Sequence, residues 1–197
     1  MHMRKLALLL TVLLAAASCK KSEQPANPSA SGTAQQQQQA QQAPPAAAGA
    51  AANAAGTDVG STMPEYGAMW LDGSKFELAG KRDKVVLLNV WATWCGPCRF
   101  EIPELQALHD RYAPKGFEVI GVSVDESGTE SVRQFVDEQK MRYPVAVDPE
   151  GKLATLLHTD VLPTSVLLDR NGRIVWKKYQ AIAPNDPELK KAIEAAL

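Results

Sequence analysis

A Cys-x-x-Cys motif stands where a buried strand gives way to a helix. Residues 85–90, Val-Val-Leu-Leu-Asn-Val, are almost continuously apolar and rich in β-branched side chains, which is typical of a strand covered on both faces. The motif Trp-Cys-Gly-Pro-Cys follows at residues 94–98, and from Pro97 onward apolar residues recur at helical spacing. The sequence therefore predicts a central strand that leads through the two cysteines directly into a helix.

This position predicts different roles for the two cysteines. A helix N-terminus presents unpaired N–H groups and the positive end of the macrodipole, which favour a thiolate over a thiol. We therefore expect Cys95 to be the nucleophile that attacks a disulfide. The short spacing lets Cys98 attack the resulting mixed disulfide and resolve it. Because so short a loop constrains little of the unfolded chain, the purpose of the pair is chemical.

The rest of the sequence offers few ligands for a metal. A zinc site would need further ligands, and beyond His2 the histidines are His109 and His158, neither in a second closely spaced ligand pair. We expect no metal and no cofactor other than the redox-active disulfide of Cys95 and Cys98. The 21 basic and 22 acidic side chains show no basic cluster that would indicate a nucleic-acid partner.

Composition divides the chain into three parts. Two basic residues precede the apolar stretch 6–17, which has the length of a signal peptide and is shorter than the ~20 residues that span a bilayer. Residues 20–57 are mainly Ser, Gln, Ala, Pro, Asn and Gly, which bury too little apolar surface to fold. We predict a lipoprotein signal peptide at 1–18, a disordered low-complexity tether at 19–60 and one folded domain at 61–197.

Small residues lead into the first cysteine of the chain. Ala16, Ala17, Ser18 and Cys19 resemble the lipobox of bacterial lipoproteins, in which the cysteine is lipidated and becomes the first mature residue. The usual leucine three residues before the cysteine is replaced by Ala16. The alternative is an ordinary signal cleaved nearby, with Cys19 left as a free thiol or removed. With lipidation, Lys20 in place of Asp favours the outer membrane, and ~40 tether residues would reach roughly 35 Å.

Strand and helix patterns alternate through the predicted domain. The Asp-Gly turn at residues 72 and 73 predicts an N-terminal hairpin over 70–78, and the Asn-Gly turn at 171 and 172 predicts a second hairpin. We expect an α/β fold with a mixed central sheet and helices on both faces. The expected strands lie at 85–90, 117–124, 145–147, 165–168 and 174–179, and the expected helices begin at 97 or lie at 131–140, 153–157 and 187–197.

The segment around the cysteines closely resembles the thioredoxin superfamily. Residues 91–103, Trp-Ala-Thr-Trp-Cys-Gly-Pro-Cys-Arg-Phe-Glu-Ile-Pro, look specifically like its extracytoplasmic TlpA/ResA branch, and the resemblance extends from about residue 67 to the end of the chain. Pro103 matches the helix-kinking proline of that family. The resemblance implies a thioredoxin-like fold and a thiol-disulfide oxidoreductase.

A second segment of the chain matches the family's substrate platform. Residues 161–164, Val-Leu-Pro-Thr, resemble the loop that carries its cis-proline and faces the cysteine pair. The resemblance implies a cis bond before Pro163 and makes Leu162, Pro163 and Thr164 the expected substrate-binding residues. Trp94, next to the first cysteine, is expected to shield the thiols and to contact the substrate.

Proton transfer distinguishes this branch from cytoplasmic thioredoxin. Six residues before the first cysteine, where thioredoxin has a buried Asp, this chain has Asn89, which cannot titrate. Glu101 matches the acid that TlpA/ResA-like proteins carry near the site, and burial would raise its pKa toward neutrality. The alternative for Glu101 is a solvated acid in the first turn of a helix, stabilised by the helix dipole.

These features together predict a membrane-tethered disulfide reductase on the periplasmic face of the cell envelope. Gly96 and Pro97 between the cysteines resemble reducing thioredoxins. A reductase in an oxidising compartment needs electrons, and the resemblance implies a membrane thiol donor of the DsbD or CcdA kind. Its expected substrates are apocytochrome c cysteines or mispaired envelope disulfides, and we expect a monomer.

Two other functions are compatible with parts of this sequence. Peroxiredoxins share the fold, but their reactive cysteine usually follows Pro and Thr at fixed distances without a Cys-x-x-Cys, and Thr93 lies only two residues before Cys95. A copper-binding or holdase lipoprotein would use the thiols as ligands. Copper chaperones of this fold space their cysteines three apart and add a downstream histidine, for which only His158 is available.

Overall fold

The structure is a computed structural model that describes residues 55–197. The predicted signal peptide, the lipidation site Cys19 and most of the predicted tether lie outside the described residues. Within residues 55–197, none of the helices is both long enough and apolar enough to span a membrane.

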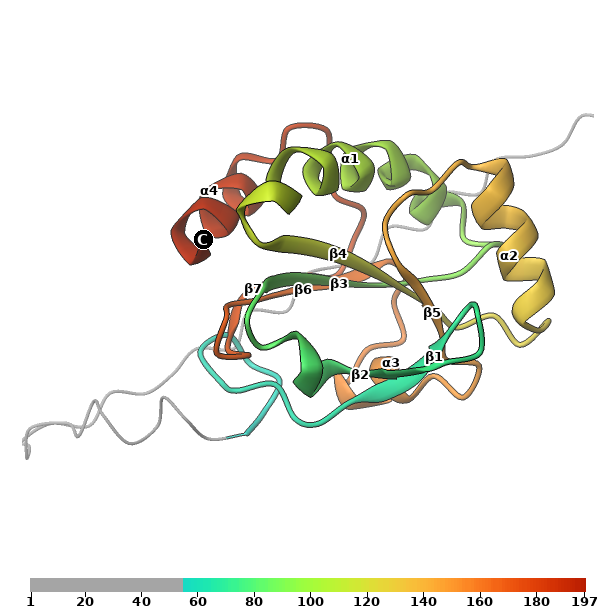
Figure 1. The fold of residues 1–197 in the computed structure, drawn as a ribbon, viewed down its shortest axis with the longest axis horizontal. Coiled ribbons are helices and arrows are strands. Elements are labelled where there is room, and N and C mark those ends of the chain that lie inside the picture. The colour runs from blue at the N-terminus through green and yellow to red at the C-terminus, as the bar shows by residue number, and fades with distance from the viewer. Residues whose placement is uncertain (1–54) are drawn as a thin grey trace, which may run out of the picture. The chain divides into compact units, whose positions relative to one another are not determined.

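Seven strands form one mixed sheet in the order β2-β1-β5-β4-β3-β6-β7 (Figure 1). The central strand β3 pairs in parallel with β4, and β4 pairs in parallel with β5, whereas the other neighbouring strands are antiparallel. The N-terminal hairpin of β1 and β2 joins the sheet because β1 pairs with β5. The strands are β1 Gly67–Trp70, β2 Lys75–Glu77, β3 Val85–Trp91, β4 Phe117–Ser123, β5 Val145–Val147, β6 Thr164–Leu168 and β7 Ile174–Lys178.

Helices cover both faces of this sheet, as the sequence predicted. Figure 1 shows α1 and α4 over one face and α3 on the other. The α-helices are α1 Gly96–Tyr112, α2 Thr129–Glu138, α3 Lys152–Leu156 and α4 Pro187–Ala196, with short 3-10 turns η2 Leu78–Lys81 and η3 Ala113–Lys115. This arrangement is the thioredoxin-like α/β fold, so the predicted fold class is confirmed.

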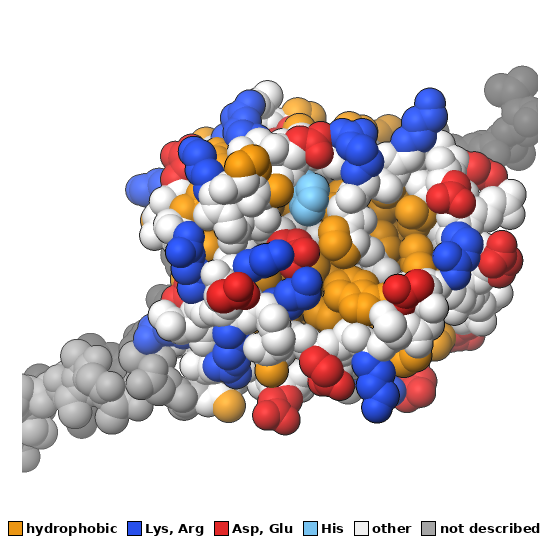
Figure 2. All heavy atoms as spheres, viewed as in Figure 1, with side chains coloured by type: hydrophobic (Ala, Val, Ile, Leu, Met, Phe, Trp, Pro, Cys, Tyr) orange, Lys and Arg blue, Asp and Glu red, His pale blue; other side chains and the backbone are white. Residues whose placement is uncertain are grey.

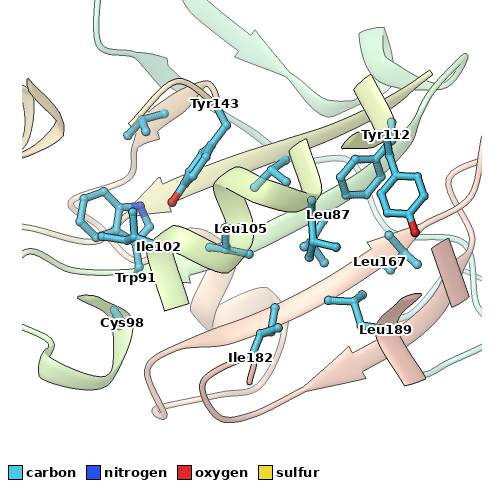
Figure 3. Close-up of a cluster of buried hydrophobic side chains, with 14 of the residues drawn as sticks. Leu87, Trp91, Cys98, Ile102, Leu105, Tyr112, Tyr143, Leu167, Ile182 and Leu189 are labelled. Atoms are coloured by element: carbon cyan, nitrogen blue, oxygen red, sulfur yellow. The ribbon is translucent and has the colours of Figure 1, made fainter. Parts of the chain in front are cut away.

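The alternation of side chains along β3 divides the core into two clusters. Leu87 and Trp91 face the cluster that contains residues of α1, α2 and α4, whereas Leu88 and Val90 face the cluster on the α3 side. Figure 3 shows the first cluster, in which Trp91 lies close to the α1 helix. Asn89 is a buried polar residue between Leu87 and Trp91, so its position on the strand points it toward α1.

Residues before the predicted start of the domain also belong to the folded part. Ala55 forms an isolated bridge with Thr62, and Gly60 N–H donates to the carbonyl of Ile174 over 2.7 Å. The composition of the chain predicts that residues 55–60 belong to the tether. The structure instead attaches them to β7, the last strand of the sheet.

The helix expected at 131–140 is shifted toward the N-terminus by two residues. It begins directly after Gly128, which has a φ of 95° that favours glycine, and ends before Lys140, whose φ is 53°. Apolar spacing locates the buried face of a helix well, but backbone turns such as these determine its ends.

Charged side chains of both signs are intermingled on the face of the molecule shown in Figure 2, with hydrophobic side chains visible between them. This distribution agrees with the nearly equal numbers of acidic and basic residues.

Candidate active site

The two cysteines lie at the N-terminus of α1 and are joined by a disulfide. Cys95 is the N-cap residue of the helix, and its Sγ accepts a hydrogen bond from the backbone N–H of Cys98 over 3.2 Å. Their Cα atoms are 5.3 Å apart, and Cys95 and Cys98 are 5% and 1% exposed. The more exposed residue of the pair is therefore the one at the helix cap, where a thiolate is favoured. Gly96 and Pro97 form the first helical positions between them.

A buried carboxylate fixes the loop between β3 and the cysteines. Asp125 accepts hydrogen bonds from the Thr93 backbone N–H over 2.9 Å and from the Thr93 hydroxyl over 2.5 Å. The Ser123 hydroxyl donates to the same carboxylate over 2.7 Å. Asp125 is a residue of the site that was not predicted from the sequence. The feature that could have identified it is its position just beyond the carboxyl end of β4, the parallel neighbour of β3.

Trp94 and Leu162 line one groove beside the cysteine motif. Trp94 is 70% exposed, which is unusual for so large an apolar side chain, and Leu162 is half-buried against the core cluster that includes both cysteines. The structure thus brings together two of the residues expected to contact the substrate. The groove is also lined by the apolar Val124 and Ala154 and by the acidic Glu126, Glu150 and Asp160.

The loop before β6 has the conformation that the resemblance implied. The bond between Leu162 and Pro163 is cis, and both Pro163 and Thr164 are buried. The Thr164 hydroxyl donates to the carbonyl of Val161 over 2.7 Å and lies 3.0 Å from the hydroxyl of Thr159. Pro163 and Thr164 therefore form the buried part of the loop. Val161, which is exposed, and Leu162, which is half-buried, are the loop residues that a substrate can reach.

Glu101 is buried one helical turn after Cys98. Its side chain is 1% exposed, so the interpretation as a solvated acid at the helix start is wrong. Oε1 accepts from Nδ2 of Asn89 and Oε2 accepts from the backbone N–H of Ile182, both over 2.8 Å. Since residues three apart share one face of a helix, Glu101 and Cys98 point into the same side of the core.

Burial raises the pKa of Glu101 to about 7. The hydrogen bonds from Ile182 and Asn89 and the positive charge of Lys178 act in the opposite direction and limit the rise. At neutral pH the carboxyl group is therefore divided between its acid and its base form. This is the range in which a side chain transfers protons most effectively.

The histidines lie apart from this arrangement. His109 is half-buried, and its Nδ1 accepts from the Val119 N–H over 3.3 Å. Nδ1 of His158 lies 3.5 Å from the hydroxyl of Thr57. Among residues 55–197, no group of three His, Cys, Asp or Glu side chains is placed to hold a metal ion.

Comparisons with known proteins agree with this site. The model of the AhpC/TSA family matches residues 59–177. The thiol-disulfide oxidoreductase ResA of Bacillus cereus is 37% identical over 119 residues, which cover 60% of this chain and 68% of the relative. ResA of Oceanobacillus iheyensis is 38% identical over 121 residues, which cover 59% of this chain and 62% of that protein.

Solved structures show the same relationship. A protein from Chlorobium tepidum, assigned as the thiol:disulfide interchange protein DsbE, is 32% identical with a TM-score of 0.66, over 71% of this chain and 97% of its own. A secreted thiol-disulfide isomerase from Corynebacterium glutamicum is 26% identical with a TM-score of 0.61, over 66% and 82%. This chain therefore belongs to the AhpC/TSA family and is a thiol-disulfide oxidoreductase of thioredoxin fold.

Proposed function

We propose that this protein is a disulfide reductase of the cell envelope that transfers two electrons from Cys95 and Cys98 to disulfides of other proteins. One observation carries the proposal. Cys95 caps α1 with its sulfur at the Cys98 N–H, and the buried Glu101 lies one turn further along the same helix face. This arrangement supplies a nucleophile, a resolving thiol and a proton acceptor.

The first step is attack by the Cys95 thiolate on one sulfur of the substrate disulfide. A bond forms between Cys95 and that sulfur while the substrate S–S bond breaks, and the other substrate sulfur leaves as a thiolate. The N–H groups at the start of α1 stabilise the attacking thiolate. The product of this step is a mixed disulfide on Cys95.

The second step requires Cys98 to lose its proton. Glu101 accepts this proton in its ionised form, and the Cys98 thiolate then attacks the sulfur of Cys95. The Cys95–Cys98 bond forms, and the second substrate sulfur leaves as a thiolate. The substrate gains two electrons, the pair loses two, and the protein reaches the oxidised state seen in the structure.

The groove beside the motif supports a polypeptide substrate. Trp94 and Leu162 provide accessible apolar surface next to Cys95, and buried Pro163 and Thr164 hold the loop that carries Leu162. An extended segment that lies along this groove would present its disulfide to Cys95. Apocytochrome c cysteines and mispaired envelope disulfides are the substrates we propose, by the family resemblance.

We place the protein outside the cytoplasm, attached to a membrane through a lipid on Cys19. The predicted lipobox supports the anchor, and Lys20 after it favours the outer membrane. The secreted Corynebacterium glutamicum relative supports the compartment. In such an oxidising compartment a membrane thiol carrier of the DsbD or CcdA kind would return the pair to its reduced form. Mass measurement of the mature N-terminus tests lipidation, since an unmodified Cys19 or its loss contradicts the anchor.

Trapping of the mixed disulfide tests the reaction itself. Reduced Cys98→Ser protein is mixed with insulin and separated without reductant. We expect a covalent complex through Cys95, and none with Cys95→Ser. In a separate assay, the rates at which reduced wild-type protein reduces insulin and hydrogen peroxide are compared. A protein that reduces peroxide quickly and insulin hardly at all would contradict the proposal and favour the peroxidase alternative.

A further inference from the structure

Three polar residues, Asn89, Ser165 and Lys178, form a row across the adjacent strands β3, β6 and β7, on the side of the sheet where Glu101 lies. Asn89 of β3 pairs directly with Ser165 of β6, and Ser165 pairs directly with Lys178 of β7. Directly opposed residues of antiparallel strands point to the same face of the sheet. The hydrogen bond from Asn89 Nδ2 to Ser165 Oγ, over 2.9 Å, confirms this for the first pair. Lys178 therefore begins on the face that α1 covers.

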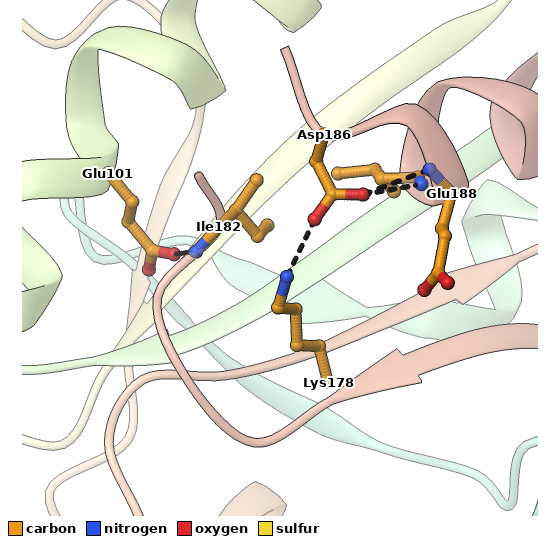
Figure 4. A network of polar contacts seen from close by, with 6 residues as sticks. Glu101, Lys178, Ile182, Asp186 and Glu188 are labelled. Carbon is orange, nitrogen blue, oxygen red and sulfur yellow. Dashed lines mark hydrogen bonds and ion pairs between the residues drawn. The ribbon is translucent and has the colours of Figure 1, made fainter. Parts of the chain in front are cut away.

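The chain after β7 returns from Lys178 to Glu101. Ile182, four residues after Lys178, donates its backbone N–H to Oε2 of Glu101, and Ile182 is buried. Nζ of Lys178 donates to Oδ2 of Asp186 over 2.6 Å, and Asp186 accepts from the N–H groups of Glu188 and Leu189 as the N-cap of α4. Figure 4 shows Glu101, Lys178 and Asp186 around this one loop. The loop is thus held between Glu101 and the Lys178–Asp186 pair.

We propose that Lys178 is a positioning residue that holds Glu101 in the ionised, proton-accepting form. The inference rests on the proposed function, in which Glu101 takes the proton of Cys98. Lys178 is not expected to touch the substrate or the sulfur atoms. It acts through Glu101, by its charge and by the loop whose N–H binds the Glu101 carboxylate.

Few other charges compete for this role. Asn89 and Ser165 are neutral, and Tyr143, from the segment between α2 and β5, has a pKa raised by burial and by the charge of Glu101, so it stays neutral. Lys178 is the cation whose charge lowers the pKa of Glu101. Asp186 partly offsets that charge, but it also keeps the ammonium group within the fold, where the Lys178 side chain is only 21% exposed. Charges held in this way are screened less by salt than surface charges.

The pair of lysines at the end of β7 provides a matched control. Lys177 is the neighbour of Lys178, but side chains alternate along a strand. Its Nζ donates to the carbonyls of Thr57 and Leu157, away from the Glu101 side. Lys177→Met also removes one positive charge from β7. It leaves the row of Asn89, Ser165 and Lys178 unchanged.

Titration of the Glu101 carboxyl carbon by NMR, in the oxidised full chain, tests the proposal. We expect Lys178→Met to raise the titration midpoint by about one pH unit, a tenfold change in the ionisation constant. Lys178→Arg and Lys177→Met should stay near the wild-type midpoint. A midpoint for Lys178→Met that equals the wild-type value would overturn the proposal.

A second pair of variants separates electrostatics from the cap of α4. Asp186→Asn keeps a good N-cap residue and should lower the Glu101 midpoint, because Lys178 then lacks its partner. Adding Lys178→Met to Asp186→Asn should raise the midpoint again. If Asp186→Asn and the double variant have equal Glu101 midpoints, Lys178 only pairs with Asp186, and the proposal is wrong.

The pH profile of disulfide exchange distinguishes this inference from the proposed function. In Lys178→Met, the pH at which mixed disulfides are resolved should move upward together with the Glu101 midpoint. If the midpoint moves and the exchange profile does not, Lys178 does control Glu101, and the proton-accepting role of Glu101 is what fails.

Discussion

Asn89 donates a hydrogen bond from Nδ2 to Oε1 of Glu101 over 2.8 Å and so links the central strand β3 to the first turns of α1. The amide cannot take up a proton, so the only titrating partner in this contact is the carboxyl group. The chain therefore keeps a buried acid near the cysteines but places it on the helix instead of on the strand.

Glu101→Gln should slow the resolution of the mixed disulfide near pH 7 by about 10²-fold, the lower range for loss of a general base. The wild-type rate should rise as pH increases through about 7, where the carboxyl ionises, and the variant should lack that rise. Stopped-flow measurement of exchange from pH 5 to 9 checks this. Glu104→Gln, on the same helix, serves as the control and should behave as wild type.

Glu101 should also make the stability of the oxidised protein depend on pH. Its pKa is raised from 4.5 to about 7 on folding, so the folded state binds this proton more tightly. The contribution of this proton to the free energy of unfolding is fully present below pH 4.5. It is lost as pH rises from there through about 7, which lowers the free energy of unfolding by about 3 kcal/mol. Urea unfolding between pH 4 and 8.5 should show this loss in wild type and not in Glu101→Gln. Parallel curves for the two proteins would refute the raised pKa.

Asp125→Ala should destabilise the protein by about 2 kcal/mol, since it leaves the Thr93 N–H and two hydroxyl groups without their acceptor. Denaturant unfolding measures the change directly. Glu126→Ala, at the next and exposed position, should alter stability by less than about 0.5 kcal/mol. Equal effects of the two substitutions would show that the Thr93 contact does not hold the loop.

Gly121→Ala should lower stability by about 1–3 kcal/mol through overpacking. A Cβ at this position of β4 would lie 2.9 Å from Nε1 of Trp91 and 3.3 Å from Cε2 of Tyr143, and both rings are buried (Figure 3). Gly80→Ala is a suitable control because, apart from its chain neighbours and its own helical turn, no atom lies within 4 Å of its added Cβ. A thermal midpoint for Gly121→Ala at or above that of the control would contradict the packing described for Trp91.

Local patterns were enough to predict most of the fold. The apolar run of β3, the helical spacing after Pro97 and the two Gly-containing turns each depend on residues close in sequence. The cysteine pair was predictable for the same reason. The cis bond before Pro163 came only from the family resemblance, because nothing local distinguishes it from a trans bond.

The surroundings of Glu101 could not be predicted in this way. Its partners Asn89 and Ile182 are 12 and 81 residues away in sequence, and the second provides only a backbone N–H, which has no signature in the sequence. Whether an acid at a helix start is buried depends on which distant parts of the chain pack against it. Asp125 and Lys178 were missed for the same reason, since their contacts join separate strands and loops.

The reduction potential of the Cys95–Cys98 pair shows whether the protein donates electrons to disulfides or withdraws them from thiols. It is measured on the purified mature protein by equilibration with glutathione or dithiothreitol buffers, with the two redox states separated by thiol alkylation. We expect a value near that of thioredoxin, about −270 mV, as a reductase requires. A value near −120 mV, in the range of the strong oxidant DsbA, would contradict it and reverse the direction of electron flow.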